Sequence, residues 1–323
     1  MSFNIIYFGT SHGPKVGVRA QDFIAGEEFS ISELQRFLDR RRPGTADVVS
    51  ARKESDIPEF RSGVTKKDGD TLVTTGGMLE AVIKNEDASR KDYEDLKYTP
   101  RPGHADYTAF VKYGEIGMTT GGGQFSGRLT APLCVLGGIC LQALEKRGIT
   151  ITAVIDAMGD AEHAKAEGDS VGGIVKAEIR GLPAGVGGPF DGGLESRLAS
   201  ALFAIPAVKG VEFGAGFAAA AMKGSESNDP FAFEDGRVIT KTNNCGGILG
   251  GISTGMPVTF RVAFKPTPSI ALPQQTVNLK TNEETTITVK GRHDACIVPR
   301  ALPAVEAAAA IVILEILNEE NRL

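Results

Sequence analysis

Three of the four histidines lie in short polar motifs that could bind and protonate a small anion. An imidazole has an unperturbed pKa near ~6.5, so it can donate or accept a proton at neutral pH. A single loop histidine is more often a bystander, but His12 together with His104 is a candidate acid for a departing phosphate. His163 lies among helix-forming charges, so we expect it at the surface. The three motifs are Ser11-His12-Gly13, Gly103-His104-Ala105-Asp106 and Arg292-His293-Asp294.

Arginines accompany these motifs. Arg101, Arg128 and Arg292 each lie near glycine in a segment that also holds His, Ser or Asp. Arg41 is the middle one of three arginines at the end of a predicted helix, where a solvated terminus that complements the helix dipole is the alternative interpretation. A guanidinium binds carboxylate or phosphate through two parallel hydrogen bonds. Several separated guanidiniums therefore predict a pocket for a ligand with several anionic groups.

Glycine is unusually frequent, with 40 of 323 residues, or about 12% against a usual ~7%. Glycine permits positive φ and close backbone approach, so its loops can direct N–H groups at phosphates or a flat ring. For any single pair of adjacent glycines, the alternative interpretation is a tight turn without a binding role. One segment, 214–219, imitates a dinucleotide fingerprint, but no second strand with a ribose-binding acid follows it, so we give it little weight. The glycine clusters are 121–123, 187–188, 192–193, 246–247 and 250–251.

The overall composition is that of an ordinary globular protein, with 41% hydrophobic and 23% charged residues. The net charge of −5 argues against a nucleic-acid partner or an anionic membrane surface. No signal peptide is visible, and the longest uncharged stretch, 242–260, holds two Asn, five Gly and a Pro. The four cysteines have neither CxxC nor zinc spacing, so we expect reduced thiols in a cytoplasmic protein without a metal.

Hydrophobic patterns predict alternating strands and helices in one domain over residues 1–323. A weak internal repeat is expected, in which sheet is followed by a buried helix near Asp191 and again near Pro303. The polar insertions 85–100 and 223–242 are predicted as surface loops. Strands are predicted at 4–8, 48–53, 72–73, 81–84, 173–180, 208–213, 257–264 and 285–289. Helices are predicted at 32–39, with a Ser-x-x-Gln start, and at 133–146, 194–203 and 302–318.

Distinctive motifs follow one another along nearly the whole chain. They are Thr10-Ser-His-Gly13, Leu38-Asp-Arg-Arg-Arg-Pro-Gly44, Arg101-Pro-Gly-His-Ala-Asp-Tyr107, Lys112-Tyr-Gly114, Gly121-Gly-Gly-Gln-Phe-Ser-Gly-Arg128, Asn244-Cys-Gly-Gly-Ile-Leu-Gly-Gly-Ile-Ser253, Phe264-Lys-Pro-Thr-Pro-Ser269 and Gly291-Arg-His-Asp294. In these motifs and their order the chain resembles the chorismate synthases. The resemblance implies an α+β single domain in which antiparallel sheets sandwich a core of long helices. It also implies a cytoplasmic homotetramer of the shikimate pathway.

The reaction that this resemblance implies is a trans-1,4-elimination. The substrate 5-enolpyruvylshikimate 3-phosphate loses phosphate and a ring proton to give chorismate, with reduced FMN (FMNH2) required but not net consumed. His12 resembles the acid at the departing phosphate, His104 the histidine beside the flavin, and Asp294 the carboxylate that helps to remove the ring proton. The chain has no added domain that suggests a flavin reductase, so an external reductase is expected as the source of reduced FMN.

Binding residues follow from the same resemblance. The implied substrate-binding residues are Arg41, Arg101, Arg128 and Arg292. The implied FMN-binding residues are Gln124, Phe125, Ser126, Pro206, Ala207, Gly250, Lys265, Pro266, Thr267, Pro268, Ser269 and Arg292. The chain departs from the family's pattern at Thr10, Asp47, Gln124, Phe125 and Pro206, and Arg52 could take over the binding role lost at Asp47.

Two other function classes are compatible with the residues alone. A flavin- or nicotinamide-dependent oxidoreductase could use the glycine-rich loops for a redox cofactor with net hydride transfer. It would consume one reduced cofactor per turnover. A non-enzymatic anion-binding module would use the arginines alone. In that case wild type and histidine variants would be equally inactive.

Overall fold

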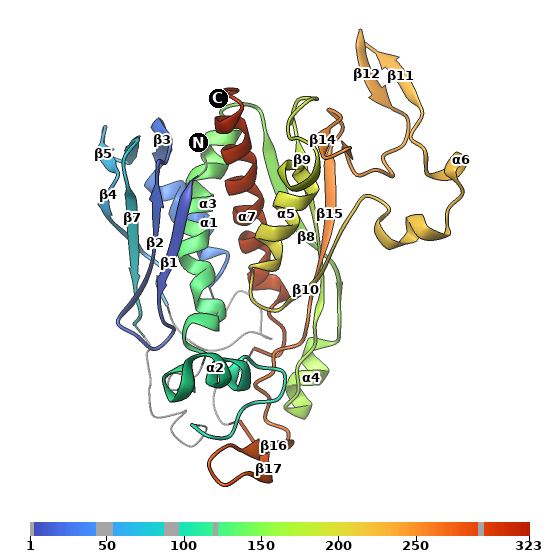
Figure 1. Ribbon diagram of the computed structural model, residues 1–323. Helices are drawn as coiled ribbons and strands as arrows, with labels where there is room; N and C mark the ends of the chain where they lie inside the picture. The colour runs from blue at the N-terminus through green and yellow to red at the C-terminus, as the bar shows by residue number, and fades with distance from the viewer. Residues whose placement is uncertain (1–2, 43–53, 87–96, 119–121, 290–293) are drawn as a thin grey trace.

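Two antiparallel sheets enclose a layer of helices (Figure 1). The computed structural model describes residues 3–42, 54–86, 97–118, 122–289 and 294–323. The helical layer contains α1 (Ile31–Asp39), α3 (Thr130–Glu145), α5 (Leu194–Phe203) and α7 (Val298–Glu319). The predicted fold class, sheets around a core of long helices, is confirmed.

The first sheet covers one side of the helices. Its central strand β2 buries Val16, Val18 and Ala20 against the helical layer, while the polar residues Lys15, Arg19 and Gln21 are exposed. A smaller three-stranded sheet, β3-β6-β5, extends this side. The order of the first sheet is β1 (Asn4–Gly9), β2 (Lys15–Gln21), β7 (Leu79–Lys84) and β4 (Pro58–Ser62). The smaller sheet consists of β3 (Ala25–Ser30), β6 (Thr71–Thr75) and β5 (Val64–Lys66).

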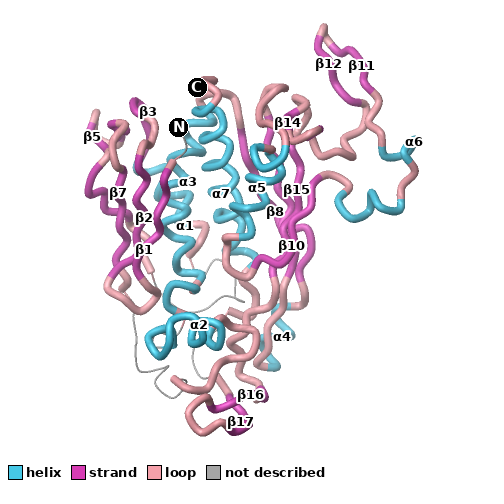
Figure 2. Tube along the Cα trace, in the orientation of Figure 1, coloured by secondary structure: helices cyan, strands magenta, loops and turns pink. Residues whose placement is uncertain are grey.

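The second sheet covers the opposite side (Figure 2). Its strand β15 alternates buried and more exposed residues, so that Val258, Phe260 and Val262 pack towards the helices. Short helices and hairpins extend from both ends of this sheet. The order is β10 (Val208–Phe213), β15 (Val258–Phe264), β9 (Gly173–Arg180) and β8 (Thr150–Met158). The smaller elements are α2 (Asp106–Tyr113), α4 (Ala161–Glu167), β13 (Ile248–Leu249), β14 (Ile252–Ser253), β16 (Gln274–Asn278) and β17 (Glu283–Ile287).

Helices α3 and α7 cross at close range in the centre. A Cβ placed on Gly137 would lie 2.2 Å from the Cβ of Ala307, so glycine allows the two backbones to approach. Glu306 is a buried charge on α7. Its carboxylate accepts from Arg40 Nη1 at 2.6 Å and from the N–H of Ala153 at 2.8 Å. These bonds tie α7 to the end of α1 and to the second sheet.

Two helical segments are long and apolar enough to cross a membrane by length and composition alone. They are Gly127–Glu145 and Val298–Glu319, and 67% and 83% of their most apolar windows are buried inside the fold. Core helices of globular proteins pass the same test, so this is weak evidence for a membrane span. Both segments form the centre of this structure.

Most predicted elements agree with the structure, with two kinds of exception. Several elements were not predicted: strands β2, β3, β4, β5, β8, β13, β14 and β16, and the short helices α2 and α4. The capping prediction for α1 was wrong, because Ser30 caps the helix by accepting from the N–H of Glu33 at 3.1 Å. The predicted strand at 48–53 lies outside the described residues. The segments predicted at 173–180, 194–203 and 208–213 are β9, α5 and β10.

The insertion 223–242 is a projecting arm rather than a loop. It contains α6 (Gly224–Ser227) and a hairpin of β11 (Phe231–Glu234) and β12 (Arg237–Thr240), which extends away from the second sheet (Figure 1). Phe233 on this hairpin is 83% exposed. Most of the other insertion, at 87–96, lies outside the described residues.

Candidate active site

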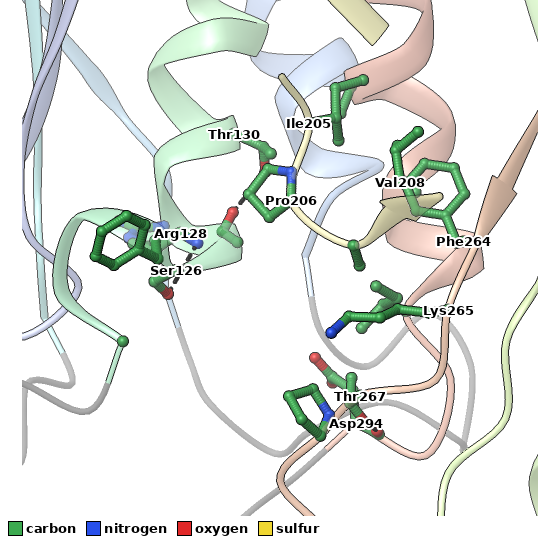
Figure 3. Close-up of a pocket in the computed structure, with 18 of the residues that line it drawn as sticks. Ser126, Arg128, Thr130, Ile205, Pro206, Val208, Phe264, Lys265, Thr267 and Asp294 are labelled. Atoms are coloured by element: carbon green, nitrogen blue, oxygen red, sulfur yellow. Dashed lines mark hydrogen bonds between the residues drawn. The ribbon is translucent and has the colours of Figure 1, made fainter. Parts of the chain in front are cut away.

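A cavity of about 710 Å³ lies where the N-terminal ends of α3 and α7 meet the segment before α2 and the segment after β15. Figure 3 shows Ser126 and Arg128 on one side, with Lys265, Thr267 and Asp294 on another. A cavity of this size can hold a drug-sized ligand. The predicted site residues that line it are Arg41, Arg101, His104, Gln124, Phe125, Ser126, Arg128, Pro206, Ala207, Lys265, Thr267, Pro268, Ser269 and Asp294.

His104 is held by Asp106, the first residue of α2. The imidazole Nδ1 lies 2.6 Å from Asp106 Oδ1, and Arg101 Nε donates to Asp106 Oδ2 at 2.7 Å. The side chain of Arg101 is buried, and its Nη1 donates to Ser269 Oγ at 3.0 Å. Burial alone would raise the pKa of Asp106, but hydrogen bonds and charges of Arg101 and His104 lower it well below its ordinary value. The carboxylate thus fixes the orientation of His104.

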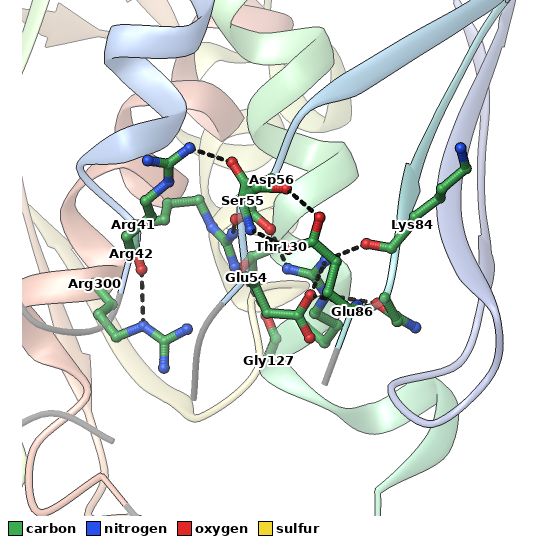
Figure 4. Close-up of polar contacts among 12 residues, drawn as sticks. Arg41, Arg42, Glu54, Ser55, Asp56, Lys84, Glu86, Gly127, Thr130 and Arg300 are labelled. Atoms are coloured by element: carbon green, nitrogen blue, oxygen red, sulfur yellow. Dashed lines mark hydrogen bonds and ion pairs between the residues drawn. The ribbon is translucent and has the colours of Figure 1, made fainter. Parts of the chain in front are cut away.

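Asp56 joins two of the predicted substrate-binding arginines. Its buried carboxylate accepts from Arg41 Nη1 (Figure 4). It also accepts from Arg128 Nη1. Burial opposes ionisation of Asp56, yet the two guanidiniums hold its pKa below the ordinary value. Arg41 Nη2 also donates to Thr130 Oγ1 at 2.9 Å. Arg41 Nε is buried and has no hydrogen-bond partner among the described residues.

Arg128 is bound on several sides by the protein itself. Its Nε donates to Asn85 Oδ1 at 2.8 Å, and its Nη2 lies 3.3 Å from the Lys84 carbonyl oxygen and 3.4 Å from Glu54 Oε2. With the bond to Asp56, four of its five N–H groups have protein partners. Arg128 therefore organises this wall of the cavity and has little capacity left for a ligand.

Asp294 lies at the opposite wall, beside the first turn of α7. Arg300 Nη1 donates to Asp294 Oδ2 at 2.8 Å, and Arg300 Nε donates to the carbonyl oxygen of Arg41 at 2.9 Å. The backbone carbonyl of Asp294 accepts from Thr267 Oγ1 at 2.7 Å. Burial lowers the pKa of Arg300, and Asp294 partly opposes this shift. Arg300 lines the cavity but was not predicted from the sequence.

Ala207 and Lys265 shape the third wall. Ala207 has φ +73, a left-handed conformation that is uncommon for a residue with a side chain. Its carbonyl oxygen accepts from the N–H of Lys265 at 3.0 Å, and Lys265 Nζ donates to the Gly103 carbonyl oxygen. Burial and the neighbouring Lys209 lower the pKa of Lys265. Strain of this kind is often found at functional sites.

His12 is half-buried next to Ser11, which contacts Gly123, and it is not among the described residues that line the cavity. Its Nδ1 lies 2.9 Å from Ser11 Oγ, and the N–H of Ser11 donates to the Gly123 carbonyl oxygen at 3.3 Å. On the cavity side, His104 Nε2 lies 3.7 Å from the position that a Cβ on Gly122 would occupy. The segment of His12 and the side chain of His104 therefore both lie close to residues 122–123.

Three predicted binding residues are not placed in the cavity. Gly250 is in the turn between β13 and β14. The neighbouring strand residue Ile252 pairs with Gly187, whose N–H bonds Glu320 just beyond the C-terminal end of α7. The cavity lies at the N-terminal end of this 22-residue helix, which spans roughly 30 Å. The structure thus does not bring Gly250 to the cavity. Pro266 does not line the cavity either, and Arg292 lies outside the described residues.

Sequence reasoning missed several polar residues of this site. Asp106 stands inside the motif of His104, so its spacing could have identified it. Asp56, Asn85 and Arg300 carry no local signal, because each reaches the site through contacts with distant parts of the chain. These residues could be found only from the fold.

Comparisons with known proteins agree on one family. The sequence model described as chorismate synthase matches residues 3–166 and 160–317. A chorismate synthase of Thermococcus kodakarensis is 44% identical over 345 residues, covering 98% of this chain and 95% of that protein. One of Korarchaeum cryptofilum is also 44% identical, covering 96% and 94%. A crystal structure of chorismate synthase superimposes with a TM-score of 0.75 at 24% identity, covering 99% of this chain and 93% of that one, which supports the fold.

Proposed function

Since the chain belongs to the chorismate synthase family, which catalyses the last step of the shikimate pathway, we propose that its cavity binds 5-enolpyruvylshikimate 3-phosphate together with reduced FMN. One observation carries this proposal: His104, Asp294 and the guanidiniums of Arg41 and Arg101 converge on a single cavity. Family membership also favours an elimination over the net hydride transfer and the passive anion binding considered above.

The proposed reaction breaks two bonds of the substrate ring. The C–O bond to phosphate breaks, phosphate leaves with the bonding electrons, and a ring C–H bond supplies the electrons of the new double bond. Asp294 would take the ring proton. His12 stays the predicted acid for the departing phosphate, although it is not among the described residues that line the cavity. Arg41 and Arg101 would bind the phosphate and carboxylate oxygens, for which planar guanidiniums are well suited.

The residues present fit a flavin mononucleotide. Apolar groups of Ile205, Pro206 and Ala207 could contact a flat ring, and the hydroxyls of Ser126 and Thr267 could bind ribityl or phosphate oxygens. The buried Nε of Arg41 still requires an acceptor. When bound, reduced FMN would supply electron density to the elimination without net redox change. Lys265 and Ser269 would contribute to holding it. Gly250, Pro266 and Arg292 remain predictions as FMN contacts, and Arg292 also remains one as a substrate contact.

We also propose a cytoplasmic homotetramer that receives reduced FMN from an external reductase. Large apolar side chains exposed at one end of the second sheet support assembly, since such groups often mark protein interfaces. Phe190, Phe217 and Phe233 are 90%, 84% and 83% exposed. The last of these lies on the projecting β11–β12 hairpin (Figure 1).

An anaerobic assay tests the function directly. Purified protein, reduced FMN and 5-enolpyruvylshikimate 3-phosphate are mixed, and chorismate absorbance and phosphate release are followed together. We expect equal amounts of both products while reduced FMN persists over many turnovers. Loss of one reduced FMN per product would instead indicate net redox chemistry, and no product at all would contradict the proposal.

Substitution of His12 and His104 tests whether these two side chains act in acid–base catalysis. His12→Ala and His104→Ala should each lower the rate by at least ~100-fold, as expected for a lost acid–base group. His163→Ala is the matched control, because the side chain of His163 is exposed and pairs with Glu167 away from the residues that line the cavity. Rates close to wild type in both test variants would refute the assignment.

A further inference from the structure

We propose that Arg300 is a positioning residue that fixes Asp294 and the Arg41 segment relative to each other at the wall of the cavity. This inference rests on the proposed function for its kinetic meaning. The geometry that supports it can be tested independently of activity.

Arg300 makes two bonds to segments that are distant in sequence. Its Nη1 holds Asp294 Oδ2 at 2.8 Å, and its Nε holds the carbonyl oxygen of Arg41, 259 residues away, at 2.9 Å. Figure 4 shows the guanidinium reaching the Arg41 backbone from α7. The same planar group therefore spans the carboxylate proposed as the base and the arginine proposed to bind substrate.

The backbone of Arg300 belongs to a rigid part of the fold. It lies in the first turn of α7, whose following residues Ala304, Val305 and Ala307 are buried. Asp294 precedes this helix in an irregular segment, and Arg41 follows α1. A functional group on a loop is positioned well when a residue on a rigid element holds it. Arg300 can do this for both segments.

The electrostatic setting shows that this position is costly for a cation. Burial and the nearby charge of Arg41 lower the pKa of Arg300, while Asp294 and the more distant Asp56 oppose this shift. The side chain of Arg300 keeps 25% of its surface exposed, which limits this cost, and its hydrogen bonds to Asp294 and to the Arg41 carbonyl oxygen offset it further. A merely structural link between α7 and α1 already exists in the ion pair of Arg40 with Glu306. We therefore assign to Arg300 the orientation of Asp294 and of the Arg41 backbone, rather than the joining of the two helices.

Proton removal is sensitive to the position of the base. A misplacement of about 1 Å can lower a rate by ~100-fold. With Arg300 in place, one carboxylate oxygen of Asp294 is fixed, and the negative charge is stabilised by an adjacent guanidinium. Loss of Arg300 should thus reduce the chemical step more than substrate binding.

Arg300→Gln tests this role, with Arg40→Gln as the matched control. Arg40 also joins the end of α1 to α7 through a buried carboxylate, but it does not line the cavity. We expect Arg300→Gln to lower kcat by about 10- to 100-fold with KM changed by less than about 3-fold. The deuterium isotope effect on kcat, measured with substrate labelled at the reacting ring carbon, should rise. Arg40→Gln should lower Tm without changing kcat or the isotope effect.

Crystal structures provide a readout besides activity. Wild type and Arg300→Gln should differ in the side-chain position of Asp294 and in the backbone at Arg41. If the Gln variant does not fold, Arg300→Lys replaces it, because lysine keeps the charge but cannot make both bonds in one plane. Unchanged kcat and isotope effect, or an unmoved Asp294, would overturn the inference. Inactive wild type would contradict the proposed function instead, and the crystal comparison would still decide the role of Arg300.

Discussion

Asn85 connects Arg128 to the loop that carries His12. Its Oδ1 accepts from Arg128 Nε at 2.8 Å, while its Nδ2 donates to the carbonyl oxygens of Thr10 and Gly13 at 3.0 and 2.7 Å. The oxygen of this single amide thus binds Arg128, and its nitrogen binds the backbone of the His12 loop. Asn85 thus anchors the backbone on both sides of His12.

Replacing Asn85 should reduce catalysis by displacing His12. Asn85→Ala removes three hydrogen bonds, so we expect kcat/KM to fall by about 10-fold or more and stability to fall by about 1–3 kcal/mol. Steady-state kinetics and urea unfolding measure the two effects. Asn243→Ala is the control, because Asn243 donates a similar side-chain bond to the Pro257 carbonyl oxygen away from the cavity. Equal kinetics in both variants would contradict the prediction.

Asp106 should make stability depend on pH in the acid range. Its pKa in the folded protein is lowered by Arg101 and His104 despite burial, below an unfolded value of about 3.9. The ionised carboxylate therefore contributes stability that is fully present above the unfolded pKa and is lost as pH falls towards the folded one. Asp106→Asn should be less stable than wild type at pH 7, and the difference should shrink below about pH 4.

Urea midpoints at pH 7, 5 and 3 measure this difference. Asp235→Asn serves as the control, since Asp235 is exposed in the β11–β12 turn and asparagine tolerates its positive φ of 48°. A gap between wild type and Asp106→Asn that stays constant over this pH range would speak against the prediction.

Gly137→Ala should destabilise the centre of the molecule. The added Cβ would lie 2.2 Å from the Cβ and 2.4 Å from the Cα of Ala307, so α3 and α7 must move apart. We expect a loss of about 1–3 kcal/mol, typical of overpacking, seen as a lower Tm. Gly224→Ala is the control, because open space surrounds that position. An unchanged Tm for Gly137→Ala would show that the helices separate without cost.

The thiols should differ sharply in reactivity. Burial raises the pKa of Cys134 to about 12, and Cys140 and Cys296 are also buried with raised pKa values. Burial and Asp229 raise the pKa of Cys245 as well, but this thiol is partly exposed, so exposure rather than pKa distinguishes it. A maleimide at pH 8 should therefore modify Cys245 alone in the folded protein and all four thiols after unfolding. Intact-mass analysis of wild type and Cys245→Ser counts the adducts, and rapid labelling of Cys134 would contradict the assigned core.

Local patterns predicted the regular elements well where one face is apolar. The segment 173–180 alternates clearly and forms β9 with those bounds. Strand β2 was missed because three consecutive residues are buried, which hides the alternation. Within the site, glycine and histidine motifs indicated His104 and Arg101. Partners such as Asp56, 72 residues from Arg128, depend on how the sheets enclose the helices, and short motifs carry no information about that.

The carboxylates that accompany the cavity's arginines affect how an anion arrives. Arg101 faces Asp106, and Arg300 faces Asp294. Arg41 and Arg128 share Asp56, and Glu54 lies 3.4 Å from Arg128 as a second carboxylate for this pair. Such opposed charges cancel each other beyond a Debye length of about 8 Å at physiological ionic strength, so the field that reaches bulk solvent is weak. Long-range steering, which makes association rates fall steeply with salt, should contribute little in this protein. Capture of a polyanion would instead be a short-range exchange of partners inside the cavity, with a rate nearly independent of salt.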